Sequence, residues 1–195
     1  VTYASDVSTA QQEATNGIAQ LKDAGVNVVT CTCDPIAPIF FTNAATSQGY
    51  FPEWLANGVL LTDLPDFERL YDQQQMAHNF GVTVFPKDTP VADGAAWKAY
   101  FAAKPNGDKA AAIGGGPYFA ALFYLFSAIE AAGPNLTPRS FAQGMFSIPA
   151  IGGETPESAH VSFGTHGPSP FTGIDDVSEF WWDGTRQGPD GHPGY

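Results

Sequence analysis

The acid at the end of one predicted strand, Asp34, is the residue whose position most clearly favours a binding role. It follows the β-branched run from 26 to 32 and precedes Pro35, which is typical of the first turn of a helix. In a parallel α/β sheet, ligands bind where strands end and helices begin. A carboxylate at that point can cap the helix, and it can also face a ligand. The sequence leaves both roles open.

Two cysteines, Cys31 and Cys33, lie in the same predicted strand, two residues apart. In an extended strand their Cα atoms would be roughly 6.5–7 Å apart, near the limit for a disulfide. Two thiols without a neighbouring histidine do not make a zinc site, which needs four ligands. We therefore predict two small thiols that are buried or line a cleft.

Chemistry typical of enzymes is absent from the local patterns. No serine or cysteine lies in a nucleophile signature such as G-x-S-x-G. The run Gly114–Gly116 lacks the spacing of a phosphate-binding loop and favours a hinge instead. His160 and His166 with Asp175 and Asp176 could gather a metal, although solvated loop residues are the favoured interpretation. We predict no enzyme activity, no metal and no cofactor.

Tyr118 begins an apolar helix directly after this glycine run. One interpretation is a core aromatic residue, and the other is a ring packed against the apolar part of a ligand. The helix, predicted over 117–132, is apolar on nearly every side, so we expect it to be buried on several sides.

Alternating helical and strand patterns predict an α/β fold with a parallel sheet. Ser8 is the expected N-cap of the first helix and Gly25 its C-terminal glycine. A Gly/Pro/Lys-rich segment, 105–116, is the best candidate for a linker. The expected helices are 8–24, 35–48, 66–79, 94–103, 117–132 and 137–146, and the expected strands are 26–32, 51–56, 59–62, 82–85 and 177–182.

The bulk composition excludes several partners. The chain has 195 residues and a net charge of -12, with only 8 Lys plus Arg. Such acidity argues against nucleic acid and against an anionic membrane surface. The chain has no signal-peptide pattern and opens on Val1-Thr2-Tyr3, which is typical of the end of a strand. We expect it to be a piece of a longer protein.

Five segments carry a resemblance to a known family: IAQLKDAGVNVVT, SQGYFPEW, HNFGV, GGPYFAALFYLFSAIEAAGPNLTPRSFAQGM and DDVSEFWWDGTRQGPDGHPG. In their order and spacing they resemble the type I periplasmic binding proteins, specifically the branched-chain amino acid (Leu/Ile/Val) binding proteins of ABC importers. The resemblance implies a three-layer αβα fold, of which this chain is the C-terminal portion. It divides the chain into the second lobe (1–104), a hinge (105–116), and helices with a C-terminal hairpin that return to the first lobe and hinge (117–195).

The resemblance also implies a function: an extracytoplasmic protein that binds an amino acid-like small molecule between two lobes and delivers it to an ABC permease. Apolar surface left by the absent part of the first lobe favours self-association. A ligand-sensing receptor or regulator domain of the same fold is the alternative, and an enzyme on a Rossmann-like fold is less favoured.

Five ligand-binding residues follow from the resemblance. Tyr3 corresponds to the loop after the first strand of the second lobe. Cys33 and Asp34 correspond to the ligand-facing position after the next strand, and Tyr118 to a ring that lines the side-chain pocket. Asn57 lies near the acid that pairs with the ligand's ammonium group in the leucine binders. Because this chain has an amide there, we expect Asp34 to take over the charge role.

Overall fold

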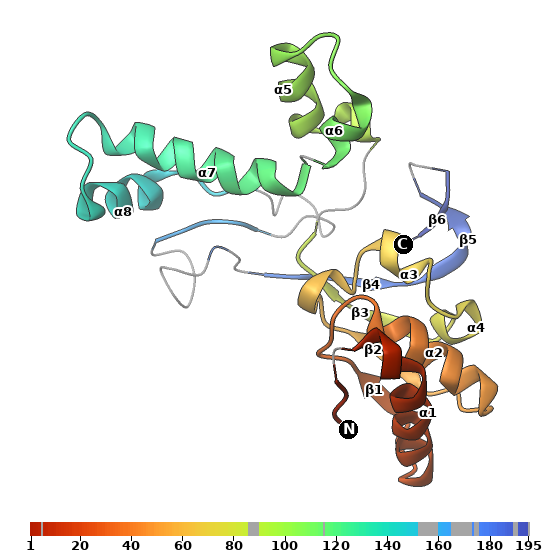
Figure 1. Ribbon diagram of the computed structural model, residues 1–195. Coiled ribbons are helices and arrows are strands. Elements are labelled where there is room, and N and C mark those ends of the chain that lie inside the picture. Colours follow the sequence, from red (N-terminus) through yellow and green to blue (C-terminus); the bar gives the residue numbers. More distant parts are fainter. Residues whose placement is uncertain are drawn as a thin grey trace. The chain divides into compact units, whose positions relative to one another are not determined.

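The chain divides into two compact units in the computed structural model (Figure 1). Unit 1 contains Val1–Phe85 and Ser178–Tyr195, and unit 2 contains Pro86–Val177. The structure describes residues 1–4, 6–85, 90–114, 116–151, 160–164, 173, 176–188 and 191–194.

Unit 1 is built on a four-stranded sheet in the order β1 (Val28–Thr30), β2 (Glu53–Ala56), β3 (Asn79–Thr83) and β4 (Ser178–Trp181). The first three strands are parallel, which confirms the predicted α/β fold, and β4 is antiparallel to β3. The sheet is therefore mixed rather than wholly parallel. The chain leaves unit 1 after β3 and returns beside the end of that strand, with Ser178 opposite Thr83, so β4 has to run back.

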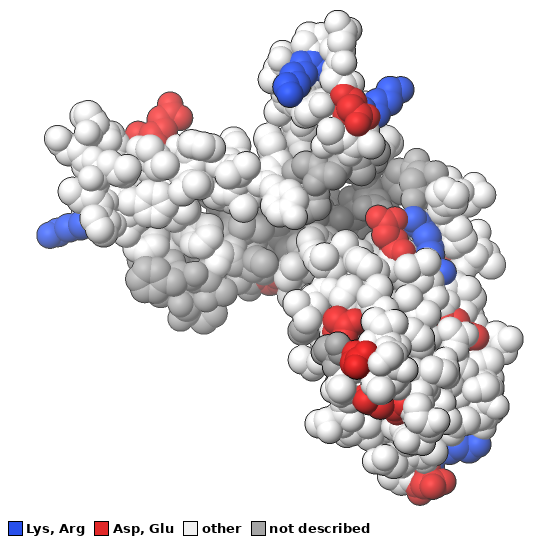
Figure 2. All heavy atoms as spheres, in the orientation of Figure 1, with Lys and Arg blue, Asp and Glu red and all other residues white. Residues whose placement is uncertain are grey.

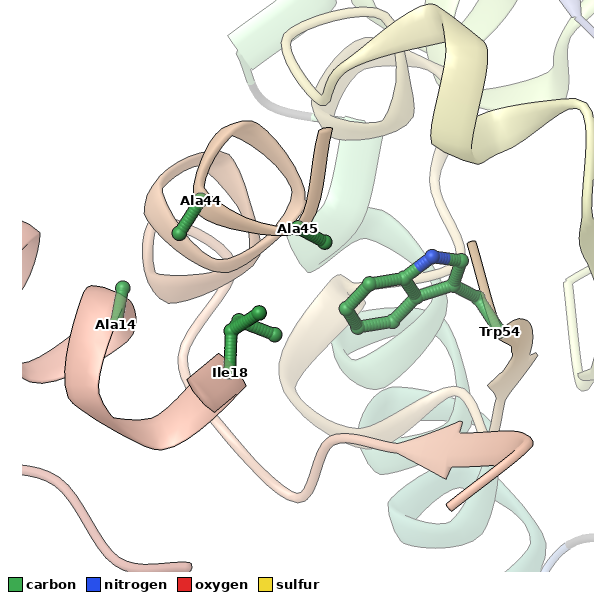
Figure 3. Packing of buried hydrophobic residues seen from close by; sticks show 5 residues of the cluster. All are labelled: Ala14, Ile18, Ala44, Ala45 and Trp54. Carbon is green, nitrogen blue, oxygen red and sulfur yellow. The ribbon is translucent and has the colours of Figure 1, made fainter. Parts of the chain in front are cut away.

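Helices α1 (Val7–Asp23) and α2 (Ala37–Ser47) pack against one face of this sheet. Their contact buries Ile18, Ala44 and Ala45 against Trp54 of β2, as Figure 3 shows. The indole nitrogen of Trp54 donates to Gln75 Oε1 at 2.9 Å, so this buried polar atom is satisfied. Burial of these side chains is the main source of stability for the part of unit 1 that carries the candidate site.

Local signals placed α1 and α2 correctly but not every detail of them. The N-cap of α1 is Asp6, whose carboxylate accepts from Ser8 N, rather than Ser8 itself, because the helix begins at Val7. Gly25 ends α1 with φ 67°, as predicted. Helix α2 begins at Ala37, so the proline in its first turn is Pro38 rather than the predicted Pro35.

Two expectations between β2 and β3 are wrong. The segment predicted as strand 59–62 is a 3-10 turn, η1 (Val59–Leu61), in which two residues have left-handed backbone. The segment predicted as one helix is two single turns, α3 (Pro65–Glu68) and α4 (Gln73–Met76), and Asn79 already belongs to β3. The helix restarts because the Asp72 carboxylate accepts from the backbone amides of Gln74 and Gln75.

The C-terminal hairpin of unit 1 was predicted as a turn-rich return and consists of β5 (Asp183–Gln187) and β6 (Pro193–Gly194). Trp182, between β4 and β5, packs with Tyr71 and Met76 in a second small core. Its indole nitrogen donates to Gln73 Oε1 at 2.9 Å. This contact ties the hairpin to the α3–α4 segment.

Unit 2 consists mainly of helices: η2 (Val91–Asp93), α5 (Ala95–Ala103), α6 (Lys109–Gly114), α7 (Gly116–Ala132) and α8 (Pro138–Ser147). Helix α6 lies inside the segment expected as a linker. Thr137 and Ser140 form the capping box that starts α8. No helix of the described segments is long and apolar enough to cross a bilayer.

Helix α7 is not buried on several sides, contrary to expectation. It packs closely on α8, where an added Cβ at Gly144 would lie 2.5 Å from the carbonyl oxygen of Ala128. Away from this contact its aromatic and aliphatic side chains are exposed, Tyr118 by 70% and Phe126 by 63%. Among the described residues, α8 therefore covers one side of α7, a helix that is apolar on nearly every side.

Candidate functional site

The structure brings together two of the predicted ligand-binding residues, Tyr3 and Asp34. The Tyr3 hydroxyl donates to Asp34 Oδ2 at 2.6 Å, and the Asp34 backbone amide donates to the same hydroxyl at 3.2 Å. Asp34 follows β1 and lies just before α2, at the carboxyl edge of the parallel strands. This is the edge at which α/β folds bind ligands.

Asp34 also holds the turn before α2. Its Oδ1 accepts from the backbone amides of Ile36 at 2.9 Å and Ala37 at 3.0 Å. Partial burial acts to raise the Asp34 pKa, but the hydrogen bonds from Tyr3, Ile36 and Ala37 outweigh it and lower the pKa below its ordinary value. Burial and the neighbouring carboxylate raise the pKa of Tyr3. At neutral pH the pair is a carboxylate and a neutral phenol.

Replacing Asp34 by alanine is expected to destabilise unit 1 by about 1–2 kcal/mol, because the hydrogen bonds from Tyr3 and from the backbone amides of Ile36 and Ala37 are lost. Urea unfolding at neutral pH measures this. A carboxylate with a lowered pKa stabilises the fold above its ordinary pKa and loses that effect as the pH falls through its folded-state pKa. The difference between wild type and Asp34→Ala should therefore shrink in acid.

Tyr3→Phe is the matched control for that experiment, because it removes the single hydroxyl and keeps the ring and the Asp34 hydrogen bonds to the turn before α2. We expect it to cost about 1 kcal/mol or less. Equal unfolding curves for wild type and Asp34→Ala at neutral pH would show that the carboxylate does not hold α2.

A small apolar hollow lies beside the Tyr3–Asp34 pair. Its volume is 160 Å³, and its walls come from the first turns of α1 and α2, with the side chains of Val7, Ile36 and Phe40. Whole small-molecule sites usually enclose about 300–1,000 Å³, so this hollow fits one part of a ligand. Its lining is suited to an aliphatic group with a polar atom at the rim.

Cys31 and Cys33 form a disulfide, with their Cα atoms 5.2 Å apart, so the predicted pair of thiols is wrong. The strand geometry behind that prediction does not apply, because β1 ends at Thr30 and the cysteines lie in the bend after it. Cys33 is only 3% exposed. Its contact with a ligand stays a prediction, in which the contacting sulfur atom belongs to a disulfide rather than to a thiol.

Asn57, at the end of β2, lies against the end of β1. Its Nδ2 donates to Thr30 Oγ1 at 3.1 Å and, more weakly, to the carbonyl oxygen of Cys31 at 3.5 Å. Cys33, Asp34 and Asn57 therefore follow the ends of two neighbouring parallel strands, β1 and β2. Tyr118 belongs to unit 2, where its ring is exposed.

The visible face of unit 1 is acidic rather than basic. Figure 2 shows several Asp and Glu side chains on the visible face of unit 1 and few Lys or Arg side chains, as expected from the net charge of -12. The described residues include no group of three or more His, Cys, Asp or Glu side chains that could hold a metal ion. His166 and Asp175, named above as part of a metal-site alternative, lie outside those residues.

The family model described as "Periplasmic binding protein" matches residues 1–169. The chain belongs to this family. The match covers most of unit 1 and nearly all of unit 2, and it confirms the broader resemblance given by the sequence motifs. It does not confirm the narrower assignment to branched-chain amino acid binders.

Two solved structures resemble this periplasmic binding protein family member. The first is "Crystal structure of ABC transporter, substrate binding protein Aeropyrum pernix", with a TM-score of 0.58, 16% identity and coverage of 93% of this chain and 46% of that chain. The second is "Fatty acid ABC transporter substrate-binding protein from Thermomonospora curvata", with a TM-score of 0.53, 16% identity and coverage of 92% and 46%. At this identity the likeness shows the fold. This chain spans about half the length of either structure, and the curated proteins include no significant match.

Sequence reasoning missed two features of unit 1. Asp63 and Glu68 are both fully buried, and Asn79 Nδ2 donates to Glu68 Oε1 at 2.7 Å. An acid-rich helix pattern normally indicates a solvated face, so nothing local marked these acids as buried. The sequence pattern predicts a strand at Leu60 and Leu61, but these residues lie in a turn with left-handed backbone.

Proposed function

We propose that this chain is part of the extracytoplasmic solute-binding component of an ABC importer and that it binds an amino acid or related small polar molecule between two lobes. The observation that carries the proposal is the family match over residues 1–169. Both matched structures, which are named as ABC transporter substrate-binding proteins, agree with it. The partner of such a component is an ABC permease, and its action is binding rather than catalysis.

The candidate site supports this role. Tyr3, Asp34 and Asn57 present polar groups at the carboxyl ends of parallel strands, where a ligand held between lobes would be bound. Cys33 lies in the same loop as Asp34. Tyr118, which belongs to unit 2, is kept as a proposed ligand contact on the family resemblance alone. Binding requires only convergent polar groups and an apolar wall, and it needs no nucleophile.

A second ligand class is favoured by one observation. The hollow beside Tyr3 and Asp34 is lined mainly by apolar side chains. One of the matched structures is named as a fatty acid binder. A carboxylate with an aliphatic chain is therefore the alternative to an amino acid.

A thermal melt of the protein in its full natural length, with a panel of amino acids and fatty acids, tests the proposal. Ligand that binds only the folded state raises the melting temperature, and the increase grows with the logarithm of ligand concentration. We expect at least one panel member to give a concentration-dependent increase, with a neutral sugar as the control. Equal melting temperatures across the whole panel would contradict the proposal.

A further inference from the structure

Two leucines, Leu60 and Leu61, lie directly after the Asn57–Gly58 turn at the carboxyl end of β2. Both have left-handed backbone, with φ 52° and φ 68°. A residue with a side chain is disfavoured in this conformation, because its Cβ crowds the following carbonyl oxygen. Glycine or asparagine is the usual choice, so two consecutive leucines go against the local preference.

Core packing does not account for these leucines. Leu60 is 62% exposed and Leu61 is 44% exposed. Burial of an apolar side chain provides free energy that can offset backbone strain, and these two exposed side chains gain little of it. Neither local preference nor the core of unit 1 therefore explains their presence.

The strained turn is held in place from both sides. On one side, Asn57 Nδ2 donates to Thr30 Oγ1 at 3.1 Å. On the other side, Thr62 and Asp63 are buried, and Leu64 N donates to Leu61 O at 3.2 Å. Strained backbone that its surroundings hold in this way is found preferentially at ligand clamps and switch regions.

We propose that Leu60 and Leu61 form an apolar lip of the ligand site and pack against the aliphatic part of the bound molecule. This inference rests on the proposed function and specifies its ligand class: a small molecule with a polar head and an aliphatic part. The polar head is held by groups such as the Asn57 amide, at the end of the same strand. A purely polar solute would leave both leucines in water.

The test uses the protein in its full natural length and two pairs of probes. Leucine and glycine share a head group, but only leucine carries an aliphatic side chain. Octanoate and acetate share a carboxylate, but only octanoate carries a long aliphatic tail. The variants Leu60→Gly and Leu61→Gly remove the side chain and also suit left-handed backbone. We expect each to melt at the same temperature as wild type or higher, while its affinity for the tail-bearing probe falls about tenfold.

Leu70→Gly is the matched control, because Leu70 is 55% exposed in the same unit and lies outside the turn. We expect this control to leave affinity unchanged. Unchanged affinity in the Leu60→Gly and Leu61→Gly variants would overturn the lip. The ligand class would be overturned if glycine binds as tightly as leucine and acetate as tightly as octanoate, or if neither leucine nor octanoate binds. Failure of the proposed function is a separate result, in which no member of the wider panel shifts the melt.

Discussion

Replacing Glu68 by glutamine is expected to flatten the dependence of the stability of unit 1 on pH. Burial raises the pKa of Glu68 from its ordinary 4.5 to about 8, the Asn79 hydrogen bond lowers it in part, and Asp63 raises it further. Oε2 of this side chain has no hydrogen-bond partner among the described residues. The folded unit therefore holds a proton that the unfolded chain releases.

The direction of the effect follows from this difference in proton binding. The contribution of Glu68 to the stability of unit 1 is greatest below about pH 4.5 and is lost as the pH rises from there through 8, by up to about 1.4 kcal/mol for each pH unit. Glutamine keeps the acceptor for Asn79 and has no proton to release in this range. Wild type and Glu68→Gln should thus diverge with rising pH, with the variant the more stable above pH 8.

Urea unfolding from pH 4 to pH 9, followed by circular dichroism, measures this divergence. Glu179→Gln is the matched control, because Glu179 is an exposed acid in β4 of the same unit. Parallel stability curves for wild type and Glu68→Gln would show that Glu68 is ionised in the folded protein at neutral pH.

Replacing Gly81 by alanine is expected to have the largest effect on the fold. Gly81 is buried in β3, between Ala56 of β2 and Phe180 of β4. An added Cβ would overlap the carbonyl oxygen of Ala56 and lie 2.7 Å from its carbonyl carbon. Because backbone atoms cannot rotate away, the two strands would have to separate, at a cost of about 3 kcal/mol or more.

Gly184→Ala is the control for this substitution. Gly184 also lies in a strand of unit 1, but an added Cβ would come no closer than 3.6 Å to another atom, the Trp182 Nε1. We expect this variant to unfold within about 0.5 kcal/mol of wild type. Similar urea midpoints for Gly81→Ala and Gly184→Ala would show that β2 and β3 are not as close as the structure places them.

Local chemistry was sufficient to predict much of the fold. Gly25 ends α1, and Thr137 with Pro138 starts α8, because capping depends on neighbouring residues. The Asp72 cap that starts α4 is also local, but distant residues hold Asp72 in place. Asp72 accepts from Thr46 Oγ1 at 2.9 Å, and its amide donates to Thr42 Oγ1 at 3.0 Å. Contacts of this kind leave no local pattern.

The candidate site shows the same division. The position of Asp34 between a strand and a helix was visible in the sequence, but the N-cap of that helix is Ile36, and Asp34 holds the turn before it. Its bond to Tyr3 joins residues that are distant in the chain, so only a resemblance could place them in one site. The Cys31–Cys33 disulfide was missed because the predicted strand was too long. The burial of Glu68 depends on how α3 packs, which its acid-rich surroundings conceal.

The pairing of β3 with β4 has a consequence for the order in which the chain folds. Thr83 and Ser178 are neighbours in the sheet, yet all of unit 2 is synthesised between them. During translation β3 therefore stays an open edge until β4 emerges, and Gly81 lacks its Phe180 neighbour for that time. Closing so long a loop costs entropy before the pairing offsets it. The four-stranded sheet of unit 1 should therefore be completed only after unit 2 has been synthesised, although its first three strands are made before unit 2.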